Sequence, residues 1–369
     1  MGKLYATLKK MTVGLLFGIL LVYVLISARD FLYPVVMALL FAYLLYPVVK
    51  KLEQWRVPRI IANLFVILTA MAAFIGLLLL LYKQLGVFLG DLPGLQEKAL
   101  SNLDGLQHSL EQKFGVRNEQ DDHWLREQVE AAFQFSGEFI GKAFMATTNT
   151  VTKFGLMPVY IFLMLYYRNK FEEFLFRIVP TPKHSQTRKI IIQISEVTRH
   201  YMAGVVIVIL ILCFINTGGL LIIGVEYALL LGILSAIMNF IPYFGTLIGG
   251  AIPLLYTLTI QGDPNKAFGV VVLFIIIQFT ENNILTPNIT GSKVNINPLF
   301  TILSIIIGGM IWGLPGMFVS IPLMGIVKIY CDNKPELSAF SFLLGTRGTE
   351  KHAFTLEKLK RLFGIGERK

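Results

Sequence analysis

Long apolar runs separated by short polar segments make up most of the chain. A helix needs roughly 20 mainly apolar residues to cross the hydrocarbon core of a bilayer. Five runs in the first part of the chain are about this long, and we interpret each as a membrane span. They cover about residues 11–28, 31–49, 60–82, 143–167 and 201–223. Pro158 lies inside the fourth run, so we expect a kink there.

The third and fourth runs are separated by the largest polar region, residues 83–142. This region holds ten acidic and six basic residues. Leu92, Leu95, Ala99 and Leu103 recur at spacings of three and four, which is typical of an amphipathic helix. Further apolar positions after residue 122 predict a second helix. We therefore expect a helical hairpin outside the membrane, on the face opposite the basic loops.

The stretch from Glu226 to Tyr330 is apolar but is interrupted by Asn, Pro and Gly. Its four apolar pieces are residues 227–240, 244–260, 267–285 and 298–329. An interrupted helix in lipid must satisfy its freed backbone groups with other protein groups or with a wet cavity. Such breaks are a pointer to the path of a substrate or an ion.

The expected topology restricts how these four pieces cross the membrane. Basic residues gather in loops 50–59 and 168–199 and in the tail, and lysine and arginine favour the cytoplasmic side. Both termini are then cytoplasmic, and the four pieces must make an odd number of crossings. Either the first two pieces join into one long broken helix, or the last piece folds back near Gly313. We favour the joined pair, because residues 227–240 are too few to span, and expect about eight spans.

Composition supports an all-α polytopic membrane protein with broken or re-entrant segments in its C-terminal half. Hydrophobic residues make up 55% of the 369 and charged residues 15%, against about a quarter charged in soluble domains. The net charge of +10 is explained by the cytoplasmic loops, so no nucleic-acid partner is expected. We divide the chain into transmembrane helices 1–3 (1–82), the extracytoplasmic hairpin (83–142), the C-terminal transmembrane core (143–330) and a basic amphipathic cytoplasmic tail (331–369).

Enzyme signatures are absent from the sequence. It contains no HExxH, GxSxG or Walker A motif, and no GxGxxG between a strand and a helix. The two cysteines, Cys213 and Cys331, have no spacing typical of a zinc or redox site. We expect a protein that is not an enzyme and that has no cofactor or metal, apart from coupling to Na⁺ or H⁺.

Polar side chains within the apolar stretch, and Pro and Gly residues at the same breaks, are the candidates for a substrate or ion path. They are Asn239, Pro242, Gly245, Gln278, Glu281, Asn282, Asn283 and Pro287. Gln278, Glu281 and Asn282 have helical spacing that predicts one shared face. An ionisable residue at membrane depth is a functional candidate by default. A second set is expected to shape the backbone as hinge or packing residues: Gly308, Gly309, Gly313, Pro315, Gly316 and Pro322.

The series of breaks resembles the C-terminal signature of the AI-2E (autoinducer-2 exporter) family. The matching motifs are Asn239-x-Ile241-Pro242-x2-Gly245 with Pro253, Glu281-Asn282-x4-Pro287-x3-Gly291, Asn297-Pro298, and Gly308-Gly309-x3-Gly313-x2-Gly316-x5-Pro322. The resemblance implies a transporter of about eight helices in the bacterial cytoplasmic (inner) membrane. It also implies that some relatives export the quorum-sensing signal autoinducer-2 and that others are linked to sodium/proton antiport.

The first hypothesis is an exporter of a small polar solute, such as a signalling molecule. The alternatives are a cation/proton antiporter, for which Glu281 is the best candidate carboxylate, and a non-transporting membrane scaffold organised by the hairpin. Expected partners are the lipid bilayer and a small polar solute or cation. The apolar stripes of the hairpin lead us to expect a homo-oligomer.

Overall fold

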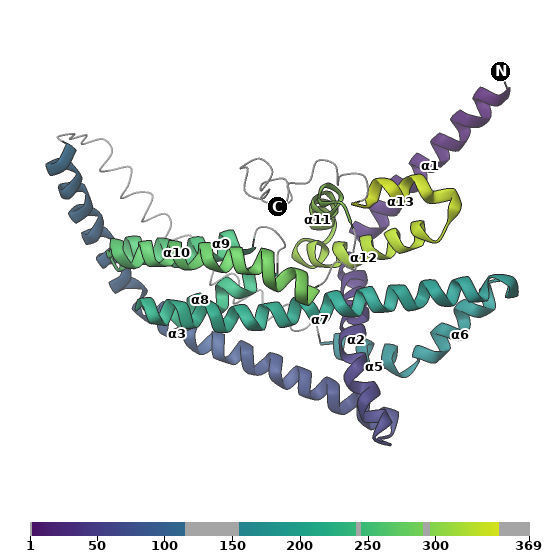
Figure 1. Ribbon diagram of the computed structural model, residues 1–369, viewed down its shortest axis with the longest axis horizontal. Helices are drawn as coiled ribbons and strands as arrows, with labels where there is room; N and C mark the ends of the chain where they lie inside the picture. The colour runs from purple at the N-terminus through teal and green to yellow at the C-terminus, as the bar shows by residue number, and fades with distance from the viewer. Residues whose placement is uncertain (1, 115–154, 241–244, 291–295, 347–369) are drawn as a thin grey trace, which may run out of the picture.

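The computed structural model describes residues 2–114, 155–240, 245–290 and 296–346, and all regular elements in these ranges are helices (Figure 1). Segments η1 and η4 are 3₁₀-helical, and η2 and η3 are π-helical. In chain order the elements are α1 (Gly2–Ser27), α2 (Arg29–Gln54), α3 (Arg59–Phe114), α5 (Met157–Tyr166), α6 (Arg168–Ile178), η1 (Thr181–Lys183), α7 (His184–Ile223), α8 (Ala228–Met238), α9 (Gly245–Leu255), η2 (Tyr256–Ile260), α10 (Pro264–Thr280), η3 (Glu281–Thr290), α11 (Pro298–Trp312), α12 (Leu314–Asp332), η4 (Pro335–Leu337) and α13 (Ser338–Leu344).

The predicted fold class is confirmed: the chain is an all-α polytopic membrane protein. Within the described residues, six helices are long and apolar enough to cross a membrane, and shorter apolar helices accompany them. The six are Lys9–Ser27, Arg29–Gln54, Arg59–Asp91, Thr181–Ile223, Pro264–Thr286 and Leu314–Asp332.

Helix α3 continues well beyond the predicted end of the third span at residue 82. It runs unbroken for 56 residues, with Pro93 inside it. Its extension packs on the C-terminal core, where Leu95 and Ala99 are buried beside residues of α8 and η2. Asn102 Nδ2 also donates to the Ile260 carbonyl oxygen at 2.8 Å. The first arm of the predicted hairpin is therefore the end of a long helix, and its second arm lies outside the described residues.

The predicted kink at Pro158 and the predicted start of the fifth span both differ from the structure. Pro158 does not kink a helix, because residues 155–156 form a turn and Pro158 lies in the first turn of α5. A proline is well tolerated there, since the first-turn N–H has no partner within the helix. Helix α7 begins 17 residues before the predicted start at Tyr201 and ends at Gly224, whose φ of +79° gives a left-handed cap. The predicted basic amphipathic helix of the tail lies outside the described residues.

Helices α10 and α11 begin where the sequence supplies capping residues. The Asp263 carboxylate accepts from the backbone N–H groups of Asn265 and Lys266 before α10. Asn297 accepts from the Leu299 N–H before α11. Both helices then start with a proline, which has no N–H to satisfy. These signals fix the start of each helix locally.

Helices α8 and α9 fold back on each other, so our expectation of one long broken helix is wrong. A methyl group at Gly245 would overlap the Asn239 backbone, and one at Gly249 would lie 2.6 Å from the Ser235 carbonyl oxygen. The Ser235 hydroxyl donates to the Gly249 carbonyl oxygen. The small residues let two backbones approach that closely, and this contact favours an antiparallel hairpin over a single broken helix.

Helices α11 and α12 also fold back, at the predicted position. Gly313 joins them with φ +65° and ψ −143°, a conformation essentially confined to glycine. Gly308 and Gly316 then bring the two backbones together, and neither position has room for a methyl group. Each folded-back pair returns to the side of the membrane from which it starts. The number of membrane crossings after α7 is then odd because of α10 alone, as the expected topology requires.

The main core joins the N-terminal helices to the C-terminal half. Its buried residues come from α2, α3, α5, α7 and α12, including Ala38, Val49, Leu165, Met202 and Val319. Figure 1 shows the C-terminal part of α7 extending from this core alongside α10, with α3 beneath them. The arrangement brings the end of α8 close to the start of η3.

An ionic group ties α2, α3 and the start of α6 together at one end. The Arg168 guanidinium pairs with the Glu53 carboxylate, and Arg59 Nε lies 3.4 Å from Glu53 Oε1. Arg168 also lies over the Tyr46 ring, 5.1 Å from its centroid. The two predicted cytoplasmic loops therefore meet on the same face of the molecule.

Substituting Glu53 with Gln is expected to lower the free energy of unfolding by about 1.5–3 kcal/mol, the usual range for hydrogen bonds to charged groups. The matched control is Glu173→Gln, which removes an exposed i,i+4 pair with Arg177 and should cost at most about 0.5 kcal/mol. Thermal unfolding of the purified variants measures both. Equal effects would contradict a structural role for the Glu53 group.

Candidate functional site

A polar cluster forms where three separate elements meet in the apolar half of the chain. Asn239 follows the last residue of α8, Thr246 lies in the first turn of α9, and Glu281 begins η3. Asn239 and Glu281 were predicted as path residues on different pieces of the chain. The structure brings them into direct contact.

Both oxygens of the Glu281 carboxylate accept hydrogen bonds. Asn239 Nδ2 donates to Oε1 at 2.7 Å, and Thr246 Oγ1 donates to Oε2 at 3.0 Å. The Thr246 hydroxyl also lies 3.3 Å from Asn239 Oδ1. The side chains of Glu281 and Thr246 are buried, each residue being 8% exposed. Because both donors are neutral, the carboxylate is hydrogen-bonded within the cluster without being neutralised by it.

The length of α8 allows this cluster to lie inside the apolar layer. Helix α8 starts beside the end of α7, where Leu220, Val225 and Ala228 share a buried cluster. Its 11 residues correspond to about 16 Å, roughly half of the ~30 Å hydrocarbon core. If α8 starts at the membrane face, Asn239 lies near the middle of the bilayer.

The residue that follows Asn239 packs against α12 next to the cluster. Phe240, which follows Asn239, stacks on Phe318 of α12 with ring centroids 4.1 Å apart and an interplanar angle of 15°. Phe318 also contacts Tyr201 of α7, 5.9 Å between centroids. The cluster therefore lies at the junction of the α8–α9 pair, the α11–α12 pair and the central helix α7.

The predicted shared face of Gln278, Glu281 and Asn282 is wrong. Glu281 is buried, Gln278 is half-buried and Asn282 is exposed. The α-helix changes to a π-helix at Glu281, so the i,i+4 neighbour turns away from the cluster. Asn283 is also exposed, and its side-chain amide donates to the Phe279 carbonyl oxygen.

The remaining predicted residues shape the backbone around the junction or fall outside the described residues. Pro242 lies in the undescribed residues 241–244, and Pro287 lies within η3. A methyl group at Gly309 would lie 2.7 Å from Met317 Cε. Pro315 occupies the first turn of α12, and Pro322 is fully buried within that helix.

The sequence interpretation missed Thr246, and it missed the partners of Glu226, the residue that opens the apolar stretch. Tyr256 Oη donates to Glu226 Oε2 at 3.0 Å, and Tyr227 Oη donates to the Asp91 carboxylate. Burial, and then the Asp91 carboxylate, raise the pKa of Tyr227 to about 12. Threonine is common in membrane helices, and only its place one residue after Gly245 distinguishes Thr246.

The chemistry of the central cluster suits recognition by hydrogen bonds. A carboxylate, an amide and a hydroxyl offer both donors and acceptors to a polar solute in a poorly solvated place, where such bonds are strong. Among the residues that the structure describes, no group of three or more His, Cys, Asp or Glu side chains is arranged to hold a metal ion.

Comparison with known proteins supports a transport role. The sequence profile of the "AI-2E family transporter" matches residues 13–336. Two Bacillus subtilis (strain 168) proteins that are provisionally named as transport proteins, YueF and YrrI, are each 28% identical to the chain. The alignments cover 82% and 80% of the chain and 83% and 84% of the relatives. The "AI-2 transport protein TqsA" of Escherichia coli (strain K12) is 25% identical over 95% of the chain and its own full length. The chain belongs to the AI-2E family of membrane transporters.

Proposed function

We propose that this protein exports a small polar solute, such as a signalling molecule, across the bacterial cytoplasmic membrane. The solute passes the cluster of Asn239, Thr246 and Glu281, where its hydroxyl groups exchange hydrogen bonds with these side chains. The proposal involves no chemical change to the solute. The observation that carries it is the buried Glu281 carboxylate bonded to two neutral donors at the junction of two helix fold-backs.

The position of the cluster supports this proposal physically. A buried carboxylate held only for stability is often replaceable by apolar residues with no loss of stability. Here it lies between the end of the short helix α8 and the start of the short helix α9. Helix ends of this kind form the solute sites of many secondary transporters. A solute that enters the junction would meet both the cluster and the backbone groups of these helix ends.

Glu281→Gln is expected to reduce solute export at least about ten-fold, the effect of losing roughly 1.4 kcal/mol of solute binding. The control is Asn283→Ala, which changes an exposed side chain two residues away and should leave export intact. Because one relative is named as an AI-2 transport protein, autoinducer-2 is the first solute to test. Its appearance in the medium of cells expressing each variant at matched membrane levels measures export. Unchanged export by Glu281→Gln would exclude the cluster from the path.

Cation/proton antiport is the second candidate function, and the neutral partners of Glu281 favour it. A buried carboxylate with uncharged donors can exchange a proton for a monovalent cation, with the Asn239 and Thr246 oxygens as further ligands. A pH step across proteoliposomes, with and without sodium, tests this function. Sodium-dependent proton flux that disappears in Glu281→Gln would support antiport, and absence of such flux in the wild type would exclude it.

A further inference from the structure

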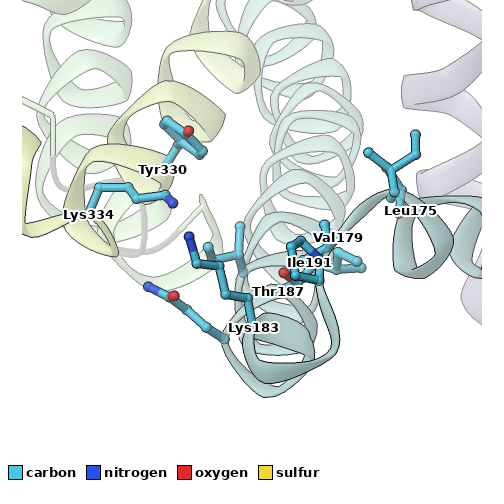
Figure 2. Close-up of a pocket in the computed structure, with 11 residues that line it drawn as sticks. Leu175, Val179, Lys183, Thr187, Ile191, Tyr330 and Lys334 are labelled. Atoms are coloured by element: carbon cyan, nitrogen blue, oxygen red, sulfur yellow. The ribbon is translucent and has the colours of Figure 1, made fainter.

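A pocket of about 380 Å³ lies far from the central cluster, between the α6–α7 turn and the end of α12 (Figure 2). It is held in shape by two hydrogen bonds between α7 and the segment after α12. Gln186 Nε2 donates to the Asn333 carbonyl oxygen at 2.6 Å, and Asn333 Nδ2 donates to Gln193 Oε1 at 2.8 Å. The function proposed above does not use this pocket.

Two lysines dominate the polar side of the pocket. Figure 2 shows Lys183, from the turn before α7, and Lys334, just after α12, extending toward each other. Lys334 Nζ also lies 5.8 Å from the centroid of the Tyr330 ring. None of the residues that line the pocket is acidic. Two converging ammonium groups repel each other unless an anion lies between them.

The other wall of the pocket is apolar and continues along α6. The pocket is lined here by Leu175, Ile178, Val179, Ile190 and Ile191. On α6 the side chains of Phe171, Phe174, Leu175 and Ile178 lie on one face and are 43–64% exposed. Three basic and two acidic residues also lie on this helix, none of whose residues is buried: Arg168, Lys170, Glu172, Glu173 and Arg177. An exposed apolar stripe with charged residues on the rest of the helix is typical of a helix lying in a membrane interface.

The ends of the neighbouring helices place the pocket at the membrane surface. Helix α12 is a candidate span whose last residue is Asp332, so Lys334 lies two residues beyond it. Tyr330 lies in the last turn of this span, and tyrosine is enriched at membrane–water interfaces. The basic residues around the pocket favour the cytoplasmic leaflet, which carries the anionic lipids.

We propose that this pocket binds one anionic phospholipid of the cytoplasmic leaflet. The lipid phosphate lies between Lys183 Nζ and Lys334 Nζ, where it accepts charge-assisted hydrogen bonds. One acyl chain runs along Leu175 and Ile178 on the exposed stripe of α6. The bound lipid thereby joins α6, the start of α7 and the end of α12, and it stabilises the folded state by RT ln(1 + L/Kd), where L is the free lipid concentration.

Binding of phosphatidylglycerol to the purified full-length protein tests the proposal, measured by native mass spectrometry with phosphatidylcholine as the neutral comparison. The wild type should retain phosphatidylglycerol and not phosphatidylcholine. The double variant Lys183→Gln/Lys334→Gln should bind phosphatidylglycerol roughly thirty-fold more weakly, since each lysine near an anionic surface accounts for about a five-fold effect. Lys183→Arg/Lys334→Arg should retain binding.

A matched control removes two charges from the same region outside the pocket. Lys170→Gln/Lys189→Gln should bind phosphatidylglycerol like the wild type, because neither lysine lines the pocket. An equal loss in both double variants would overturn the proposal in favour of general surface attraction. Displacement of the lipid by millimolar inorganic phosphate would also overturn it, because the site would then recognise free phosphate.

Discussion

Replacing Gly316 with alanine is expected to remove most of the folded protein from the membrane. The added methyl group would overlap the Gly308 carbonyl oxygen, and it would also lie 2.9 Å from Trp312 Cβ. The first of these is a backbone atom that no side-chain rotation can move, so α11 and α12 must separate. Overpacking a tight contact costs about 1–3 kcal/mol, and more where backbones shift, against a total stability of about 5–15 kcal/mol. The yield of monodisperse protein and its thermal unfolding midpoint measure the effect.

Gly76→Ala is the control for this experiment. Gly76 lies within α3 and has no other heavy atom within 4 Å of the added methyl group. Alanine is a better helix former than glycine by about 1 kcal/mol, so this variant should be as stable as the wild type or slightly more stable. If Gly316→Ala behaved like Gly76→Ala, the close approach of α11 and α12 would be wrong.

Hydropathy predicted much of this fold, because the membrane imposes a length on each helix. The apolar runs of α1, α2, α3 and α7 were recognised from composition, and so was the break at Gly313. The direction of the chain after α8 was not predictable in the same way. Short helices satisfy the same hydropathy whether they continue or fold back, and the contact between Ser235 and Gly249 decides between the two. That contact joins residues on opposite sides of a break.

The candidate site was predicted in part, residue by residue, but its assembly was not. Asn239 and Glu281 stood out as polar residues in apolar sequence, yet they lie on pieces 42 residues apart. Their pairing depends on the fold-back of α8 and α9. The exposure of Asn282 depends on the π-helix that begins at Glu281, and residue spacing carries no signal for such a change in helix type. The lysine pocket likewise unites two loops that are distant in sequence.

The same hydrogen bonds of the cluster hold the local structure together and lie on the proposed solute path. Glu281 holds the start of η3 to the α8–α9 tip, so any opening of a path here must break or exchange those bonds. A variant that loses export has therefore lost either a solute contact or the local structure. The two explanations are separated by a destabilising substitution whose lost stability a second, apolar substitution restores while the polar groups stay absent.

Asn239→Leu is expected to destabilise the protein by about 2–3 kcal/mol and to abolish export. The variant leaves Glu281 Oε1 without the donor that now lies 2.7 Å away. A buried charged group that loses one of its partners is no longer compensated for its desolvation, and this cost lowers the free energy of unfolding. Asn282→Leu is the control, because Asn282 is exposed and forms none of the hydrogen bonds of the cluster. Thermal unfolding and export at matched membrane levels are measured for both variants.

Adding Glu281→Met to Asn239→Leu should restore most of the lost stability, because the pair then presents two apolar side chains of similar volume where a charge had lost a partner. Export should remain absent, since the carboxylate and the amide are both gone. Recovery of stability without recovery of export would assign these two polar groups to the solute path. Recovery of both would show that the cluster only holds the α8–α9 tip against η3, and that the solute passes elsewhere.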